Sequence, residues 1–445
     1  MQEYTRRLPR LATSPMPAIS AVSGAWEFIF SNASAAGWLV AFLPLLDLVV
    51  GQAQAKWLLQ ADPLSLSQAY HGAAMLVLAM VLISKLRWLA VSARGLLPAV
   101  VCLGASLLVT VVCILAEGDL TLETIVAVGQ VIYWLILFLA VLSLASSKAD
   151  RFLVLGGIVV AGLYASVCVI YIYFTAGQDA SIYEKLIGNA AGFATAKGLT
   201  GVLATAGLVG LWMFRTRNRP LGAAILLVCI VGMLLTYQRA GLVGFVVAVV
   251  WLAWWGLRNR SRSETSWAMF GAALLVAAAL ALLALVGTGG LEQKWADMGD
   301  LEKAGSGRAA FWQVALTHYG QMDPLSKVSG IGYTRTAESL ERRYGARIHT
   351  HSDFLDFLLM YGALGFVGYV AFHACVVRFV LRLNKSSSAL AAGLAIYIVM
   401  LSQAFFTGQA LAPSVMSCYL GAIACICATP DQQPVQRAGM ETEGR

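Results

Sequence analysis

The sequence predicts an all-α, polytopic integral membrane protein with about twelve transmembrane helices and one large, partly helical loop between spans nine and ten. Three observations carry this prediction: the composition, the long apolar runs and the placement of basic residues. Of 445 residues, 59% are hydrophobic and 12% are charged, whereas a soluble globular chain carries about 25% charged residues. This composition excludes a soluble enzyme.

The apolar runs are long enough for membrane helices, which need about 20 residues per crossing. They divide the chain into spans one to nine within 1–288, an outer loop at 289–352, spans ten to twelve within 353–428, and a cytoplasmic tail at 429–445. The runs lie at roughly 34–52, 65–84, 95–116, 124–145, 152–175, 190–214, 220–237, 239–257, 266–288, 353–380, 387–408 and 411–428.

Basic residues mark every second loop, which is typical of the cytoplasmic side of a membrane protein. The net charge of +8 therefore indicates membrane orientation, and we expect no nucleic-acid partner. An even number of spans places both termini in the cytoplasm. The basic residues of these loops are Arg6, Arg7, Arg10, Lys85, Arg87, Arg94, Lys148, Arg151, Arg215, Arg217, Arg219, Arg258, Arg260, Arg262, Arg378, Arg382, Lys385, Arg437 and Arg445.

The polar segment 289–352 falls on the opposite side, and we expect function to concentrate there. Apolar residues at helical spacing predict a helix over 307–320, and a polar helix is expected over 336–346. Two glycines between them predict a tight turn at 330–333.

Four ionisable residues fall in the outer half of the apolar runs. A charge inside a membrane helix costs on the order of 3 kcal/mol, so each is a candidate for substrate binding. The alternative for the first three is snorkelling to the headgroups or a structural ion pair. These residues are Asp47, His71, Lys197 and Arg239.

Arg239 is the most specific of them. It follows Gln238 and lies between two apolar runs with almost no loop, where Gly241 and Gly244 permit close backbone approach. A guanidinium stays charged and binds phosphate oxygens through two parallel hydrogen bonds. The pattern favours phosphate binding.

Arg308 follows Gly305-Ser306-Gly307 and opens the expected helix. Free N–H groups at a helix N-terminus together with an arginine favour an anion such as pyrophosphate. The alternative is a solvated residue at the helix cap.

Two histidines, His349 and His351, precede the apolar run that follows Asp353. No third ligand stands at a familiar spacing, so we expect no metal site. A neutral histidine suits general base chemistry, because its pKa lies near 6.5. The alternative is that Ser352 or Asp353 only caps the next helix.

These elements together resemble the O-antigen ligase and polymerase superfamily of membrane glycosyltransferases. The resemblance covers roughly 190–410 and lies in three short motifs: Arg239-Ala240-Gly241 opening a span, Gly307-Arg308 to Trp312 in a long outer loop, and His351-Ser352-Asp353 leading into the next span. Family members often have Asn after the histidine and an acidic residue before the following glycine. Ser352 and Tyr361 stand at those positions here.

Within the superfamily, the size, the spans and the single large loop look like an O-antigen ligase. The resemblance implies a protein of the bacterial inner membrane, active on its periplasmic side among membrane lipids. It implies an undecaprenyl-pyrophosphate-linked donor, a lipid A-core acceptor and metal-independent, inverting transfer without a cofactor. Arg239 and Arg308 would stabilise the leaving diphosphate, and His351 would be the base, with His349 orienting or replacing it.

Three alternatives stay open. An O-antigen polymerase shares the chemistry but uses a lipid-linked glycan as acceptor. A protein O-oligosaccharyltransferase normally brings a larger or additional outer domain. A secondary transporter would use intramembrane charges for ion coupling, but the large loop holding Arg308 and His351 argues against transport. The sequence does not indicate an oligomeric state.

Overall fold

The computed structural model describes residues 33–57, 60–61, 64–85, 96–118, 120–175, 196–216, 218–236, 238–258, 308–344, 350–383 and 388–428. Within these ranges the regular secondary structure is helical apart from one short antiparallel pairing of β1 (Gln60–Ala61) with β2 (Leu64–Ser65). The long helices are α2 (Ala35–Trp57), α3 (Leu66–Ser84), α5 (Leu97–Ala116), α6 (Leu122–Leu144), α7 (Lys148–Thr175), α9 (Ala196–Thr216), α10 (Arg219–Leu235), α11 (Arg239–Arg258), α19 (Gly362–Leu381), α20 (Ser388–Phe406) and α21 (Pro413–Cys427).

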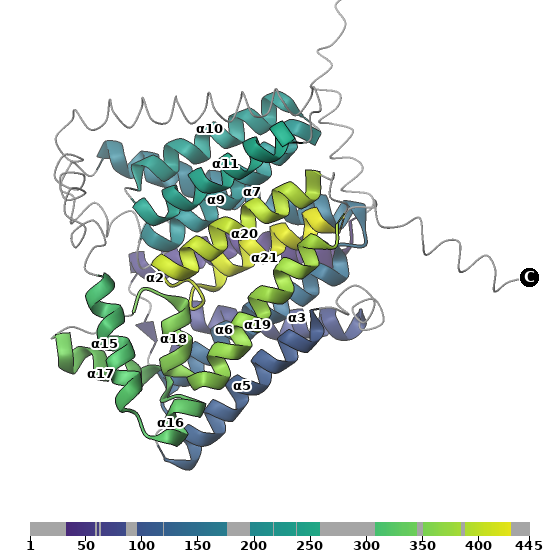
Figure 1. Ribbon diagram of the computed structural model, residues 1–445. Coiled ribbons are helices and arrows are strands. Elements are labelled where there is room, and N and C mark those ends of the chain that lie inside the picture. The colour runs from purple at the N-terminus through teal and green to yellow at the C-terminus, as the bar shows by residue number, and fades with distance from the viewer. Residues whose placement is uncertain are drawn as a thin grey trace, which may run out of the picture.

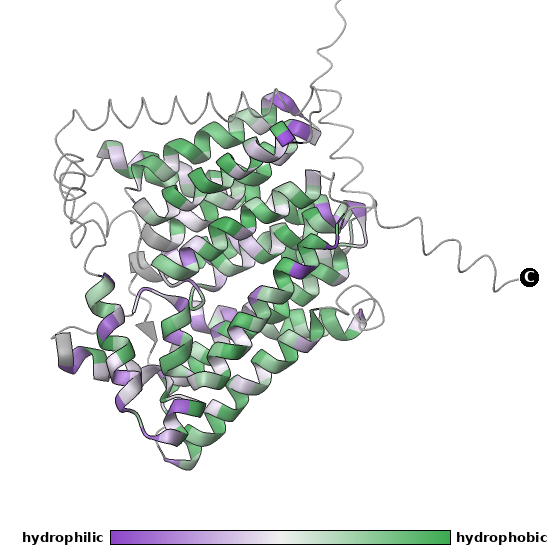
Figure 2. Ribbon diagram, viewed as in Figure 1, coloured by the Kyte–Doolittle hydropathy of each residue, from purple (hydrophilic) through white to green (hydrophobic). Residues whose placement is uncertain are grey.

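The predicted membrane protein is confirmed at the level of its apolar helices. Among the described residues, nine helices are long and apolar enough to cross a membrane, and α10 and α21 are apolar but shorter. Figure 2 shows hydrophobic residues along these helices and hydrophilic ones gathered toward the helix ends and in the short helices α15 to α17. The ninth expected span, 266–288, lies outside the described residues, so the count of twelve stays a prediction.

The tenth expected span, 353–380, is not one helix. It consists of α18 (Asp353–Met360) and α19, with a break at Tyr361 and Gly362. Gly362 has a φ of 66°, a left-handed conformation that side chains with a Cβ rarely adopt. A Cβ on Gly362 would also meet the backbone of Gly330 at 2.5 Å. The break therefore makes room for the neighbouring loop, and a hydropathy pattern does not detect it.

Loops that the basic-residue pattern assigns to one side of the membrane do meet in space. At one end of the bundle, Ser34 N–H donates to Asp150 Oδ1 at 2.7 Å, and Arg151 donates to the carbonyl of Ala428. At the end that holds α18, the hydroxyl oxygens of Thr121 and Thr334 lie 2.5 Å apart. These contacts join residues that the sequence assigns to the same side, and the orientation of the helices in a membrane stays a prediction.

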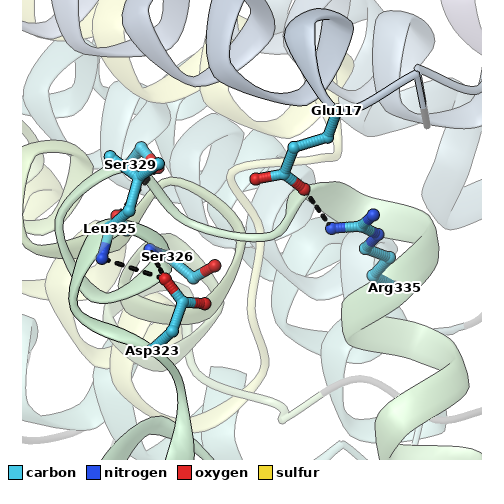
Figure 3. A network of polar contacts seen from close by, with 6 residues as sticks. All are labelled: Glu117, Asp323, Leu325, Ser326, Ser329 and Arg335. Atoms are coloured by element: carbon cyan, nitrogen blue, oxygen red, sulfur yellow. Dashed lines mark hydrogen bonds and ion pairs between the residues drawn. The ribbon is translucent and has the colours of Figure 1, made fainter.

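Three short helices form a cap beside α18 at one end of the bundle: α15 (Arg308–Gln321), α16 (Pro324–Ser329) and α17 (Gly332–Tyr344) (Figure 1). The expected helix at 307–320 is confirmed as α15. The expected turn at 330–333 is confirmed in part: Gly330 and Gly332 both have a positive φ, but α17 already begins at Gly332, four residues earlier than expected. Helix α16 was not expected. Asp323 caps it by accepting the N–H groups of Leu325 and Ser326, each at 3.0 Å (Figure 3).

The cap has its own small core, which includes Ala315, Met322 and Leu359. Leu359 belongs to α18, and its carbonyl accepts the N–H of Ile331 at 3.1 Å. The cap is therefore fixed to the helix that follows His351.

Candidate functional site

His351 lies in a backbone conformation that is unusual for its residue type. Its φ is 57°, and among the described residues it is the only one other than glycine with a positive φ. Such a conformation costs on the order of 1–3 kcal/mol and persists when the surroundings enforce it. Strain of this kind is concentrated at functional sites, which favours a functional role for His351.

Both neighbours of His351 are buried, Thr350 at 1% and Ser352 at 3% exposure. The Thr350 hydroxyl lies 2.7 Å from Asp356 Oδ1, and the Thr350 N–H donates to the same oxygen at 3.3 Å. The N–H of Ser352 donates to the Thr350 hydroxyl at 3.2 Å. The residues on either side of His351 are thereby tied to each other and to the first turn of α18.

The first turn of α15 packs on this loop. The rings of Phe311 and His351 lie 6.2 Å apart edge to face, and Trp312 Nε1 donates to the Thr350 carbonyl at 3.1 Å. Arg308 stands three and four residues before these two side chains, hence on the same helix face. The structure therefore brings the half-buried Arg308 and His351, far apart in sequence, to neighbouring turns.

Asp353 does not serve as a simple helix cap. Ser352 holds the N-cap position of α18 without a capping hydrogen bond from its side chain. Asp353 instead accepts the N–H of Ala410 at 2.8 Å and the Tyr369 hydroxyl at 3.1 Å. Burial, and then the nearby charge of Asp356, raise the pKa of Asp353 to about 8, against the lowering effect of the Ala410 hydrogen bond. Asp353 thus joins α18 to the turn between α20 and α21.

A chain of buried polar side chains continues from that turn. Gln409 Nε2 donates to Thr407 Oγ1 at 2.9 Å, and Thr407 Oγ1 lies 3.2 Å from Gln403 Oε1. Gln403 Nε2 then donates to Thr200 Oγ1 on α9 at 3.1 Å. Because polar groups inside an apolar bundle are costly unless they are paired, this chain fixes how α9 and α20 meet.

The start of α11 lies against the same chain. A Cβ on Gly241 would stand 2.5 Å from Thr200 Oγ1 and 2.6 Å from Gln403 Nε2, so a larger residue would displace these side chains. Arg239 is two residues before Gly241, and Lys197 is three residues before Thr200. The backbones of both basic residues therefore lie at the bundle end that holds His351. Their side chains lie outside the described structure.

The remaining expected residues fall in two places. Gln238 is half-buried directly before α11, and its N–H donates to Thr236 Oγ1 at 3.4 Å. Asp47 and His71 form a pair between α2 and α3, with Asp47 Oδ1 3.3 Å from His71 Nε2. This is the geometry that the structural ion-pair alternative predicts. His349 lies outside the described residues.

Sequence reasoning missed several residues that shape this site. Asp356 had a visible signal, because it is a carboxylate inside an apolar run. Trp312 was part of a motif, but its partner, the carbonyl of Thr350, is a main-chain atom that no sequence pattern displays. In the part of the chain that the structure describes, no three His, Cys, Asp or Glu side chains gather as metal ligands.

The apolar helices define a membrane protein, and a network of buried polar side chains that includes Thr350, Asp353 and Gln403 lies at one end of its helix bundle. Residues 223–370 match the family model described as O-antigen ligase. The match includes Arg239, Arg308 and His351, and over these residues it confirms the predicted resemblance to the O-antigen ligase and polymerase superfamily. No curated protein matches the chain.

Proposed function

We propose that the protein is an O-antigen ligase, which transfers O-polysaccharide from undecaprenyl pyrophosphate to the core sugars of lipid A. The family match supports a glycosyl-transferring enzyme of this superfamily. One observation carries the proposal: the first turn of α15, which begins at Arg308, packs on the loop that holds His351. Phe311 and Trp312 make these contacts. We infer from this contact that the guanidinium of Arg308 and the imidazole of His351 act on the same substrate.

The leaving group of this reaction is a diphosphate. As the bond between the anomeric carbon and the diphosphate oxygen breaks, negative charge grows on that oxygen. Fixed cations in a site of low dielectric constant stabilise such charge without the cost of reorganising water. Arg308 opens α15, where helix N–H groups add to its positive charge. Arg239 is proposed to act from the start of α11, with Lys197 and Gln238 contacting the same donor.

The acceptor hydroxyl must lose its proton as it attacks the anomeric carbon. We assign this proton to the imidazole of His351, whose neighbour Thr350 is held by Asp356 and Trp312. A single displacement on the face opposite the diphosphate inverts the anomeric configuration. The residues named here supply a base and cations, so the proposed step needs no metal ion. His349, which precedes the loop, is proposed to assist His351.

The proposed location is the bacterial inner membrane, with the site on the periplasmic side and both termini in the cytoplasm. The basic loops support this orientation. At the bundle end assigned to the cytoplasm, the Arg258 guanidinium lies 5.2 Å from the ring centroid of Trp254, a contact typical of side chains at a membrane interface. Donor and acceptor are both lipids, so they would reach the site from within the outer leaflet.

Complementation tests this function. The chain and its His351→Ala variant are expressed in a Gram-negative strain that lacks its own ligase, and lipopolysaccharide is resolved on a gel. Restored long-chain lipopolysaccharide with the wild-type chain, lost with the variant, is expected. If a polymerase-deleted strain regains its ladder while the ligase-deleted strain does not, the protein is a polymerase and the ligase proposal is wrong.

A further inference from the structure

We propose that a pocket between α17 and the turn that joins α5 to α6 is an oligosaccharide-binding subsite, an inference that rests on the proposed function. The pocket has a volume of about 560 Å³, within the 300–1,000 Å³ range of small-molecule sites. Its lining includes Thr121, His318, Thr334, Glu338, Ser339 and Arg342.

Side-chain contacts across the two walls hold the pocket in shape. Arg335 on α17 forms an ion pair with Glu117 at the end of α5 (Figure 3). Next to this pair, the hydroxyls of Thr121 and Thr334 lie 2.5 Å apart, and Thr334 Oγ1 donates to Glu123 Oε2 at 3.2 Å. The pocket is therefore a built feature of the interface between the cap and the membrane helices.

The charges at the pocket balance, which favours an uncharged ligand. Arg335 is offset by Glu117, and Arg342 lies 3.6 Å from Glu338. A phosphate site would need excess positive charge, whereas a sugar offers hydroxyls that donate and accept hydrogen bonds. The hydroxyls of Thr334 and Ser339, with the guanidinium groups and Glu338, present donors and acceptors of that kind.

The pocket is rigidly connected to the proposed transfer site. Helix α15 carries Arg308 at its first residue and His318 ten residues later. At 1.5 Å per residue, the two positions are about 15 Å apart along the helix axis. Ile331, also in the lining, is hydrogen bonded to Leu359 of α18, the helix that follows His351. A glycan with its reacting sugar at Arg308 is thus long enough to reach the pocket when it has several sugar units.

Two glycans take part in the proposed reaction, the donor polysaccharide and the acceptor core. Both offer sugar hydroxyls that donate and accept hydrogen bonds. The experiment measures, by titration calorimetry on the purified full chain, the binding of two probes released by mild acid from lipopolysaccharide: core oligosaccharide and O-polysaccharide fragments. We expect one of them to bind, and the probe that binds identifies the source of the glycan. Ser339→Trp, which fills the pocket, should weaken binding at least about tenfold, or 1.4 kcal/mol.

Glu341→Trp is the matched control, because Glu341 is exposed on the same helix and does not line the pocket. It should bind like the wild type. Arg342→Gln, at a side chain that is 79% exposed, provides a second variant that leaves the fold intact, and it should also weaken binding. Equal loss in Ser339→Trp and Glu341→Trp, no binding of either probe, or displacement of the probe by an equal concentration of inorganic phosphate would overturn the subsite.

The two proposals fail separately. A chain that restores ligation in cells but binds neither probe contradicts the subsite and leaves the proposed function standing. If the protein binds one probe and Ser339→Trp weakens that binding, the subsite is supported. If the same protein restores neither ligation nor polymerisation in cells, the proposed function is wrong.

Discussion

The indole Nε1 of Trp312 donates a hydrogen bond to the main-chain carbonyl of Thr350 at 3.1 Å, so the helix that carries Arg308 is fastened to the residue before His351. The ring of Trp312 also stacks on Phe406 at the end of α20, with centroids 6.2 Å apart. One side chain thereby joins the cap, the histidine loop and the membrane helices.

Trp312→Phe keeps an aromatic ring for the stack but removes the donor. One neutral hydrogen bond contributes about 0.5–1.5 kcal/mol, so kcat should fall about two- to tenfold while the KM values stay near those of the wild type. Rates of transfer by purified protein measure this. Trp254→Phe, at the far end of the bundle, is the control and should leave kcat unchanged. An unaltered kcat in Trp312→Phe would show that this bond does not position the site.

Asp356→Ala should lower kcat more strongly, by roughly 10- to 100-fold, because it leaves two buried Thr350 donors without their charged acceptor. Asp356→Asn retains one acceptor oxygen and should recover part of the loss. If Asp356 acts by positioning His351, the pH dependence of kcat/KM changes in the alanine variant and returns toward the wild type in Asp356→Asn. Identical pH profiles in all three proteins would contradict that role.

The pKa of Asp353, raised by burial to about 8, makes stability depend on pH. The folded state holds this proton more tightly than the unfolded chain, whose aspartate has a pKa near 3.9. The contribution to the free energy of unfolding is therefore complete below about pH 4 and is lost as the pH rises through about 8. Asp353→Asn mimics the protonated form, so its melting temperature in detergent should vary less than that of the wild type between about pH 5 and about pH 9. A wild type that becomes more stable as the pH rises through this range would contradict the assignment.

Gly241→Ala should destabilise the protein and reduce transfer, because its Cβ would stand 2.5 Å from Thr200 Oγ1 and 2.6 Å from Gln403 Nε2. Overpacking of this kind typically costs about 1–3 kcal/mol. Gly129→Ala on α6 is the matched control, since a Cβ there meets nothing within 4 Å and alanine is the better helix former. Thermal unfolding in detergent compares the two. Equal melting temperatures would mean that the α9, α11 and α20 contact tolerates a methyl group.

Hydropathy alone predicted where the apolar helices lie, because a membrane helix is specified by the length of its apolar run. It predicted a single span at 353–380, because the run is continuous across Tyr361 and Gly362. The break depends on a positive φ and on the close approach of Gly330. Neither of these changes the hydropathy.

The candidate site could be proposed from the sequence where it consists of ionisable side chains. Arg308 and His351 were identified from residue type and context, and the structure brings their turns together. The residues that hold them were not identified: Thr350, Gln403 and Thr407 are uncharged, and their importance comes from long-range hydrogen bonds. Asp47 and His71 carried the same sequence signal as Lys197, yet the structure pairs them with each other.

The most direct measurement compares single-turnover transfer by the purified wild type, His351→Ala and Arg308→Ala, with lipid-linked polysaccharide as donor and lipid A-core as acceptor. Size-exclusion chromatography and thermal unfolding establish that each variant is folded. We predict that both variants lose transfer by at least about 10²-fold, the lower end of what a general base contributes. Wild-type rates in both variants would contradict the assignment of Arg308 and His351 to the transfer site.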